Sequence, residues 1–253
     1  MFSIIIPTYN QLSLMQRALQ SVCQQQDVMF EVIITDDSTT NDIESHISSL
    51  NDKRIRYFHH RPSLGAVCNW NFGLSQAQGD YVILLHHDEA MGSNNYLKQL
   101  QTEFDEGYDV VVSNIKVVVD NCIKPQHFTT AIKRFIFNHP TLLFLANAVG
   151  PCACITFRRS QLQTFCDELH WSVDVEWYYR MLLGRKVRYV PQLVIHSIHG
   201  HEGQITQQLD IKNTFETDRL IVNRLHSSKP AVRLMLWLYK LLIINVKRLL
   251  HKI

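Results

Sequence analysis

Three short apolar runs, each followed directly by polar residues, are the feature that most constrains the fold of this chain. They occupy residues 2–6, 30–35 and 81–85, and a helical pattern over 13–26 separates the first two. Runs of this length are typical of buried strands, and strands that alternate with helices favour a parallel sheet covered on both faces. The sequence therefore predicts an α/β protein with a Rossmann-like, mixed and mainly parallel sheet flanked by helices.

The rest of the chain continues this alternation less regularly. Further strands are expected at 54–59, 110–119, 152–157 and 187–198, the last with Pro191 at an edge or a bulge, and helices at 65–77, 94–106 and 173–183. Residues between 120 and 151 show no regular pattern. Because no linker rich in Gly, Pro or Ser interrupts the chain, residues 1–228 are expected to form one domain.

Composition and charge exclude several classes of protein. With 46% hydrophobic and 19% charged residues, the chain is expected to fold rather than to be disordered. The net charge is +2, and six basic residues lie in 229–253 without an acidic one, which leaves −4 for residues 1–228. Nucleic-acid binding is therefore not expected. The six cysteines lack metal-site spacing, and no secretory signal is visible, so free cytosolic thiols are predicted.

Polar clusters follow the three apolar runs, and parallel strands would bring them to one edge of the sheet. The clusters are Pro7, Thr8 and Tyr9, then Asp36 and Asp37, then His86, His87 and Asp88. No glycine-rich phosphate loop is present, but a divalent cation held by oxygen ligands can bind a diphosphate instead, with Asp88 as the first candidate. Plain structural alternatives are a helix cap at 36–42 and a capping turn at 86–88.

The order of these motifs resembles the family-two glycosyltransferases of the GT-A fold. The resemblance rests on Ile6-Pro7-Thr8-Tyr9-Asn10, Asp36-Asp37-Ser38-Thr39, Gly73 to Gly79-Asp80-Tyr81, and the acidic motif after them. It covers at least residues 2–100, with weaker similarity onward. It implies an inverting enzyme with a nucleotide-sugar-binding half at 1–100 and an acceptor half at 101–228.

The resemblance also implies roles at the donor end. Pro7, Thr8 and Tyr9 would contact the nucleotide, with the Tyr9 ring stacked on the base. Asp37 would hydrogen-bond the base, with Asp36 as its neighbour. These five residues and the two histidines that follow, His86 and His87, are the predicted nucleotide-sugar contacts.

The metal motif of the resembling family is Asp-any-Asp, whereas this chain has His86-His87-Asp88. Asp88 would contact the cation, and His86 would bind the metal, a bridging water or the sugar. Since histidine can ligate manganese while magnesium favours oxygen, Mn²⁺ is expected to serve at least as well as Mg²⁺. His201 is a further candidate for metal or phosphate, in a segment, 201–206, that resembles a family loop near the diphosphate; a purely structural histidine is the alternative.

Sugar transfer needs a general base for the acceptor hydroxyl. The segment 172–180 resembles the family's base-bearing helix, which makes Asp174 the candidate and Glu176 the second choice. Val173 replaces the usual preceding Glu. The alternative is that both acidic residues only stabilise the first helical turn.

The tail at 229–253 is predicted to be a basic amphipathic helix, with Arg233, Lys240 and Lys247 spaced by seven. Such a helix can lie on an anionic membrane, here the inner face of the cell membrane, or it can pack on the domain or on a second subunit. The expected location is therefore cytoplasmic, with peripheral membrane contact.

Together these patterns predict a metal-dependent inverting glycosyltransferase of the hexosyltransferase type. The donor would be a nucleotide diphosphate sugar, with UDP-sugars first, and the acceptor a saccharide or lipid-linked molecule in surface polysaccharide synthesis. A nucleotidyltransferase is disfavoured because the first loop lacks Gly and basic residues. A binding module without catalysis stays open because of the departures at His86 and Val173.

Overall fold

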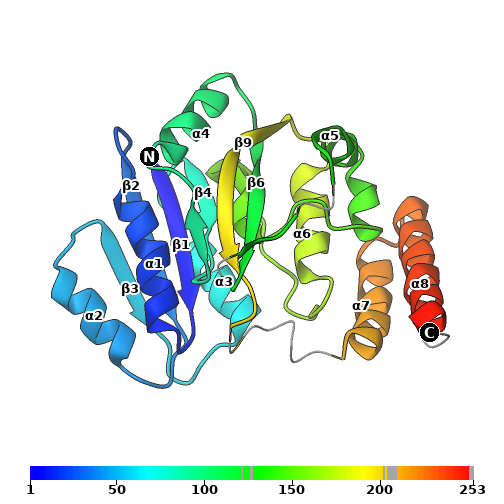
Figure 1. Cartoon of the computed structure of the whole chain (residues 1–253), viewed down its shortest axis with the longest axis horizontal. Coiled ribbons are helices and arrows are strands. Elements are labelled where there is room, and N and C mark those ends of the chain that lie inside the picture. Colours follow the sequence, from blue (N-terminus) through cyan, green and yellow to red (C-terminus); the bar gives the residue numbers. More distant parts are fainter. Residues whose placement is uncertain (121, 126–127, 202, 204–209, 251–253) are drawn as a thin grey trace.

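The computed structural model describes residues 1–120, 122–125, 128–201, 203 and 210–250, without the side chains of 243–250 (Figure 1). One sheet forms the centre of the molecule, in the order β3-β2-β1-β4-β8-β6-β9-β5, with β7 paired to β6. The strands are β1 Phe2–Thr8, β2 Phe30–Asp36, β3 Ile55–His59, β4 Tyr81–Leu84, β5 Glu89–Met91, β6 Val110–Val119, β7 Cys122–Ile123, β8 Ile155–Arg158 and β9 Val187–Ile198.

The four longest strand registers, β1–β2, β2–β3, β1–β4 and β6–β9, are parallel, whereas β8, β5 and β7 pair antiparallel with their neighbours. The predicted mixed, mainly parallel sheet is confirmed. In β9 the register with β6 shifts so that Ser113 pairs with Val190 and Asn114 with Val194. The predicted irregularity at Pro191 is therefore a bulge inside a strand whose bounds match the prediction.

Helices cover the sheet, and several of them lie beyond it on one side of the molecule. They are α1 Leu12–Cys23, α2 Asp42–Leu50, α3 Ala66–Ser75, α4 Tyr96–Asp105, α5 Thr130–Asn138, α6 Val173–Leu182, α7 Ile211–Leu225 and α8 Pro230–Leu250, with short 3₁₀ turns η1 Pro140–Phe144, η2 Cys152–Cys154 and η3 Arg159–Gln161. Figure 1 shows α5, α6, α7 and α8 gathered on the side of the molecule away from β3. The acceptor half predicted at 101–228 thus contributes most of this helical side.

The first two strands explain why polar residues meet at one edge. Every residue of β1 and β2 is buried, as expected for central parallel strands. Thr8 lies in register with Asp36, so the segments that follow both strands begin side by side. Helix α3 packs closely on this pair because Gly73 lacks a Cβ atom, which would otherwise overlap the side chain of Ile5. The sheet edge and the start of α3 therefore form one wall.

Three regions differ from the expectations. The strand predicted at 152–157 begins only at Ile155, because 152–154 form the 3₁₀ turn η2. The stretch without a pattern contains α5, whose first turn is capped by Thr129 accepting from the backbone N–H of Ile132. Helix α7 was also not expected. All six cysteines lie within described residues and are free thiols, as predicted.

The tail forms a helix, α8, as predicted, up to residue 250; residues 251–253 lie outside the described part. Its first half packs on the domain: Val232 and Leu236 are buried, and Lys240 forms an ion pair with Glu216 of α7 at 2.9 Å. The alternative of packing on the domain therefore holds for this half. Within the described residues, none of the helices combines the length and the hydrophobicity that crossing a bilayer requires.

Candidate active site

A cavity of about 1090 Å³ opens where β1, β2 and β4 end, and it extends toward the helices of the second half. Its wall contains nine of the eleven residues predicted to act in binding or catalysis, while Asp36 and Glu176 are not part of it. The nine are Pro7, Thr8, Tyr9, Asp37, His86, His87, Asp88, Asp174 and His201. Residues from 7 to 201 thus meet in one space.

At the donor end, Tyr9 exposes 50% of its surface, whereas Thr8 is buried beside it. Asp37 also lines the cavity, and the protein hydrogen-bonds one oxygen of its carboxylate, whereas the other, Oδ1, is buried without a hydrogen-bond partner among the described residues. Oδ2 accepts from the Ser63 hydroxyl at 3.0 Å and from the Gly65 backbone N–H at 2.9 Å, and Oδ1 lies 3.3 Å from Nδ1 of His60. Asp37 therefore fixes the turn that leads into α3.

Asp36 lies beneath this surface. Its buried carboxylate accepts from the Ser38 backbone N–H at 2.8 Å and from the Tyr57 hydroxyl at 2.7 Å. Sequence reasoning placed Asp36 next to the nucleotide, but the structure places it in the floor, where it ties β2 to β3.

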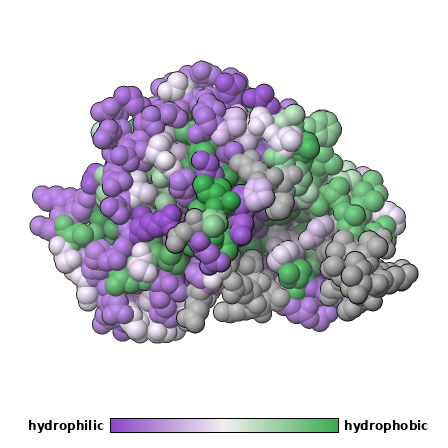
Figure 2. All heavy atoms as spheres, in the orientation of Figure 1, coloured by the Kyte–Doolittle hydropathy of each residue, from purple (hydrophilic) through white to green (hydrophobic). Residues whose placement is uncertain are grey.

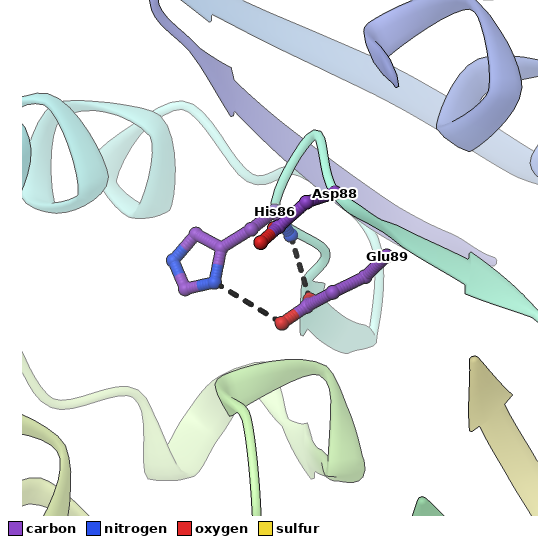
Figure 3. A group of neighbouring side chains, drawn as sticks. All are labelled: His86, Asp88 and Glu89. Carbon is purple, nitrogen blue, oxygen red and sulfur yellow. Dashed lines mark hydrogen bonds and ion pairs between the residues drawn. The ribbon is translucent and has the colours of Figure 1, made fainter. Parts of the chain in front are cut away.

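The turn between β4 and β5 carries a cluster of metal-binding side chains. His86, Asp88 and Glu89 each offer a ligand atom, and these atoms lie within 4.8 Å of one another. Figure 3 shows Glu89 reaching back to His86: its carboxylate accepts from the His86 backbone N–H at 2.8 Å and lies 3.3 Å from Nδ1. Glu89 was assigned no role from the sequence, although its position directly after Asp88, in the same acidic motif, was a usable signal.

Burial and neighbouring charges set the protonation of this cluster. Burial opposes a charge on His86, but the Glu89 carboxylate raises the pKa of His86 to about 9. Burial also raises the pKa of Glu89. Burial lowers the pKa of His87. For Asp88 burial is outweighed by the hydrogen bond to His201 and by His86, which together lower its pKa.

This donor set fits a divalent cation. Two carboxylates and an imidazole suit Mn²⁺, and the carboxylates alone suit Mg²⁺. Nε2 of His86 is buried and has no hydrogen-bond partner in the described part of the chain. His201, the third predicted ligand, contacts the cluster through Asp88, with Nε2 3.1 Å from Oδ2. Of the predicted loop 201–206, residues 202 and 204–206 lie outside the described residues.

Asp174 reaches the same cavity from the second residue of α6. Burial raises the pKa of its carboxyl, and Cys152 donates a weak hydrogen bond to Oδ1 with a sulfur-to-oxygen distance of 3.5 Å. The start of α6 is held by Asp218 of α7, whose buried carboxylate accepts from the backbone N–H groups of Trp171 at 2.7 Å and Ser172 at 2.6 Å. Sequence reasoning missed Asp218 because nothing in the local pattern of α7 distinguishes it.

Glu176 has a different environment one half-turn later. Both its oxygens are bound by Arg180, at 2.7 and 2.8 Å, and Oε1 also lies 2.9 Å from Nε2 of His226. Burial opposes the charge, but His226 and Arg180 lower the pKa of Glu176. Since Glu176 is 1% exposed and absent from the cavity wall, its geometry is that of a residue joining α6 to the end of α7.

The residues that the sequence motifs singled out thus line one cavity, with Asp36 and Glu176 as the exceptions. The family model described as "Glycosyl transferase family 2" matches residues 3–165. The chain belongs to this family. The family relationship that the sequence motifs predicted is thus confirmed.

Two curated relatives match less than half of this chain. GalNAc(5)-diNAcBac-PP-undecaprenol beta-1,3-glucosyltransferase of Campylobacter jejuni is 35% identical over 115 residues, which are 44% of this chain and 37% of that protein. The putative colanic acid biosynthesis glycosyl transferase WcaA of Escherichia coli is 34% identical over 96 residues, which are 37% of this chain and 34% of that protein. The chain thus spans little more than a third of the length of either relative.

Solved structures share the fold over nearly the whole chain. Residues 1–349 of S. aureus TarS in complex with UDP-GlcNAc superpose with a TM-score of 0.69 at 21% identity, covering 87% of this chain and 65% of that one. The mannosyltransferase PcManGT from Pyrobaculum calidifontis, in complex with GDP-Man and Mn²⁺, gives a TM-score of 0.65 at 16% identity and covers 94% and 68%. The predicted GT-A fold is confirmed.

Proposed function

We propose that this glycosyltransferase transfers a sugar from a nucleotide diphosphate donor, with UDP-sugars first, to an acceptor hydroxyl, with a divalent cation and inversion at the anomeric carbon. The observation that carries the proposal is the cavity itself, in which Tyr9, Asp88 and Asp174 line one continuous wall. These residues come from three separate parts of the chain and would serve the base, the diphosphate and the acceptor.

At the donor end, the exposed Tyr9 ring offers a flat face for a nucleobase, with Pro7 and Thr8 beneath it. Next to it, His86, Asp88 and Glu89 would hold Mn²⁺ or Mg²⁺, which would neutralise charge on the departing diphosphate. His87 and His201 would contact the diphosphate from the same wall. The nearby neutral His87 can donate one hydrogen bond without adding positive charge.

At the acceptor end, Asp174 is the proposed general base. As the acceptor oxygen forms its bond to the anomeric carbon, its proton moves to the Asp174 carboxylate, and the bond between the anomeric carbon and the diphosphate oxygen breaks. A single displacement of this kind inverts the configuration. The raised pKa of Asp174 makes it a stronger base than an exposed aspartate. Glu176, the second candidate from the sequence, is excluded from our proposal because its oxygens are already bound.

The acceptor is proposed to be a saccharide or lipid-linked molecule in surface polysaccharide synthesis. The names of the C. jejuni and E. coli relatives support this class. Helix α8 supports it independently. Leu236 and Tyr239 line the cavity, whereas Leu234 and Trp237 are half-exposed on the outer surface. Figure 2 shows apolar residues gathered on the side of the molecule where α5 and α8 lie. Contact of this side with a cytoplasmic membrane face would bring a lipid-linked acceptor to the cavity.

A donor screen tests the proposal. Purified protein is heated with Mn²⁺ and each of a panel of UDP-, GDP- and dTDP-sugars, because a ligand of the native state raises the unfolding temperature. At least one UDP-sugar should raise the unfolding temperature only when Mn²⁺ is present, and it should be turned over with inversion once an acceptor is supplied. Failure of every nucleotide sugar to bind or react would overturn the proposal.

A further inference from the structure

Lys133 of α5 is a buried ammonium group in the cavity wall that the proposed chemistry does not use. Helix α5 buries Lys133, Ile136 and Phe137, and Lys133 is 3% exposed, whereas the neighbouring Arg134 is exposed. A lysine is seldom buried to this degree unless an anion pairs with it, because removing a charge from water is costly. Lys133 is therefore an exception on an otherwise apolar helix face.

The protein gives this ammonium group a neutral partner but no carboxylate. Nζ donates to Oδ1 of Asn114 at 2.8 Å and lies 5.8 Å from the centroid of the Tyr189 ring. The Asn114 amide is held in this orientation because its Nδ2 donates to the carbonyl of Pro191, in the bulge of β9, at 3.4 Å. Among the described residues, no Asp or Glu forms an ion pair with Lys133. Since an ammonium has three N–H groups, at least one is available to a ligand.

Burial has a direct effect on the charge of this group. It lowers the pKa of Lys133, because the charged form is less favourable away from water. An anion bound beside the ammonium would oppose that effect and stabilise the charged form. The cavity wall thus contains a cation whose missing counter-ion a ligand can supply.

Strand register separates Lys133 from the proposed metal site. Asn114 pairs with Val194, three residues before Ser197, and Ser197 pairs with Glu89. At about 3.3 Å per residue, these backbone positions are about 10 Å apart along the strands. Because Nζ of Lys133 is held at Asn114, it marks a second anion position, apart from the one proposed for the donor diphosphate.

The 3₁₀ turn η2 connects this second position to the proposed base. At its first residue, the Cys152 thiol donates to Asp174, and at its last residue the Cys154 thiol donates to the backbone carbonyl of Asn114 at 3.7 Å. One turn therefore contacts both the base and the residue that binds Lys133. This places Lys133 at the acceptor end of the cavity.

The cavity walls at this end are apolar. Helices α5 and α8 both pack on η1, and Leu143 and Phe144 of η1 and Leu236 of α8 line the cavity. On the outer surface of α5, Ile132 and Phe135 are exposed. Figure 2 shows apolar residues gathered on this side of the molecule. A cation between apolar walls and next to an apolar surface fits a ligand that joins an anionic group to a hydrocarbon chain.

The chemistry of possible acceptors narrows the choice. A neutral saccharide offers only hydroxyl groups, so it would leave the charge of Lys133 without an anion. An acidic saccharide supplies a carboxylate but no hydrocarbon for the walls. A phosphate ester of a long-chain alcohol supplies both, since its oxygens accept charge-assisted hydrogen bonds and its chain removes apolar surface from water.

We propose that Lys133 forms an ion pair with a phosphate group of a lipid-linked acceptor, whose hydrocarbon chain lies along the apolar walls formed by η1 and α8. The inference rests on the proposed function, because it places the acceptor in the same cavity. It narrows that acceptor from a saccharide or lipid-linked molecule to a lipid phosphate.

Equilibrium binding of farnesyl diphosphate and of farnesol tests the inference, because the two share a hydrocarbon chain and differ in the anionic group. The protein is first saturated with UDP and Mn²⁺, so that the donor site is occupied. Wild-type protein should bind farnesyl diphosphate at least about tenfold more tightly than farnesol. Lys133→Met should weaken farnesyl diphosphate binding by at least about tenfold and change farnesol binding by less than about twofold.

Arg134→Met is the matched control, because it removes the same charge from the next residue of α5, which is exposed and does not line the cavity. It should leave both affinities within about twofold of wild type. Lys133→Gln keeps a donor for Asn114 but removes the charge, and it replaces Lys133→Met in the comparison if thermal unfolding shows that the methionine variant does not fold.

Equal affinity of the wild type for farnesyl diphosphate and farnesol would overturn the inference, and so would unchanged farnesyl diphosphate affinity in Lys133→Gln. Binding of glucuronate that depends on Lys133, with farnesyl diphosphate binding independent of it, would overturn the assignment to a lipid phosphate and point to an acidic saccharide. In each case retained UDP binding leaves the proposed function intact, whereas a wild-type protein that binds no nucleotide with Mn²⁺ would overturn the proposed function as well.

Discussion

Two clusters in this chain are built from similar side chains, but they differ in how far the protein pairs their carboxylates and in the direction in which it shifts the carboxyl pKa values. The cavity cluster consists of His86, Asp88, Glu89 and Asp174, and the helix clamp of Glu176, Arg180 and His226. In the helix clamp both Glu176 oxygens are bound by cations, and its pKa is lowered. In the cavity cluster burial raises the pKa of Glu89 and Asp174, and Nε2 of His86 has no hydrogen-bond partner among the described residues.

The contrast shows that burial alone does not identify a catalytic carboxylate. Asp174 and Glu176 lie in the same helical turn, and both are acidic residues near a helix N-terminus. What separates them is whether the protein satisfies their oxygens. The Glu176 carboxylate is hydrogen-bonded by Arg180 and His226 and stabilises the fold. The Asp174 carboxylate faces the cavity, accepts a weak hydrogen bond from the Cys152 thiol and is available to a substrate.

The largest expected effect comes from Asp174→Asn. The substitution removes the proposed base but keeps its shape, so kcat should fall by about 10²–10⁴-fold while donor affinity and the unfolding temperature stay close to wild type. Initial rates with a donor found by the screen, together with thermal unfolding, measure both. Glu176→Gln is the matched control in the same turn. An equal loss of kcat in both variants at unchanged stability would contradict the proposal that Asp174 acts in catalysis and Glu176 does not.

Asp88→Asn should produce the next largest effect. Losing one carboxylate of the cavity cluster should weaken Mn²⁺ binding by at least about tenfold and reduce Mn²⁺-dependent donor affinity with it. Calorimetric titration of Mn²⁺ into the protein without donor measures this directly. Asp36→Asn serves as the comparison, because Asp36 is buried in the floor outside the cavity. Unchanged Mn²⁺ affinity in Asp88→Asn would remove Asp88 from the metal site.

Within the helix clamp, Glu176→Gln should act on stability rather than chemistry. The partly buried Arg180 and His226 would lose their carboxylate, at a cost of about 2–3 kcal/mol in the free energy of unfolding. Because the pKa of Glu176 is lowered in the folded state, its contribution is fully present above its unfolded pKa and is lost as pH falls through the folded value.

Denaturant unfolding of wild type and Glu176→Gln between pH 7 and pH 3 measures this contribution. The difference between the two proteins should be largest near neutrality and shrink in acid. A difference that stayed constant over this range would show that the charge of Glu176 does not stabilise the fold.

The smallest effect is expected at the outer face of α8. Replacing the half-exposed Leu234 and Trp237 by Ser should weaken cosedimentation with anionic vesicles by about three- to tenfold, with donor affinity unchanged. Deleting the whole tail is a poorer test, since Val232 and Leu236 are buried in the domain. Equal cosedimentation of wild type and the double variant would argue that this face binds protein or solvent instead.

Much of the donor half could be predicted from local pattern. The runs that form β1, β2 and β4 are buried along their whole length, and the polar residues that follow them mark the cavity, so periodicity and motif order were sufficient. The second half could not be predicted as well. Its helices α5 and α7 were not predicted although both are amphipathic, and the role of Asp218 depends on backbone amides that lie 46 to 48 residues away in the sequence.

The sequence by itself determined the family, the α/β sheet, the bulge at Pro191 and the convergence of the polar segments on one edge, because each follows from short-range patterns and from their order along the chain. Only the tertiary structure decided which buried polar atoms remain free. It paired Glu176 with His226, placed Asp36 beneath the cavity and brought Glu89 against His86. The physical reason is that hydrogen bonding of buried groups depends on partners distant in sequence, which no local pattern contains.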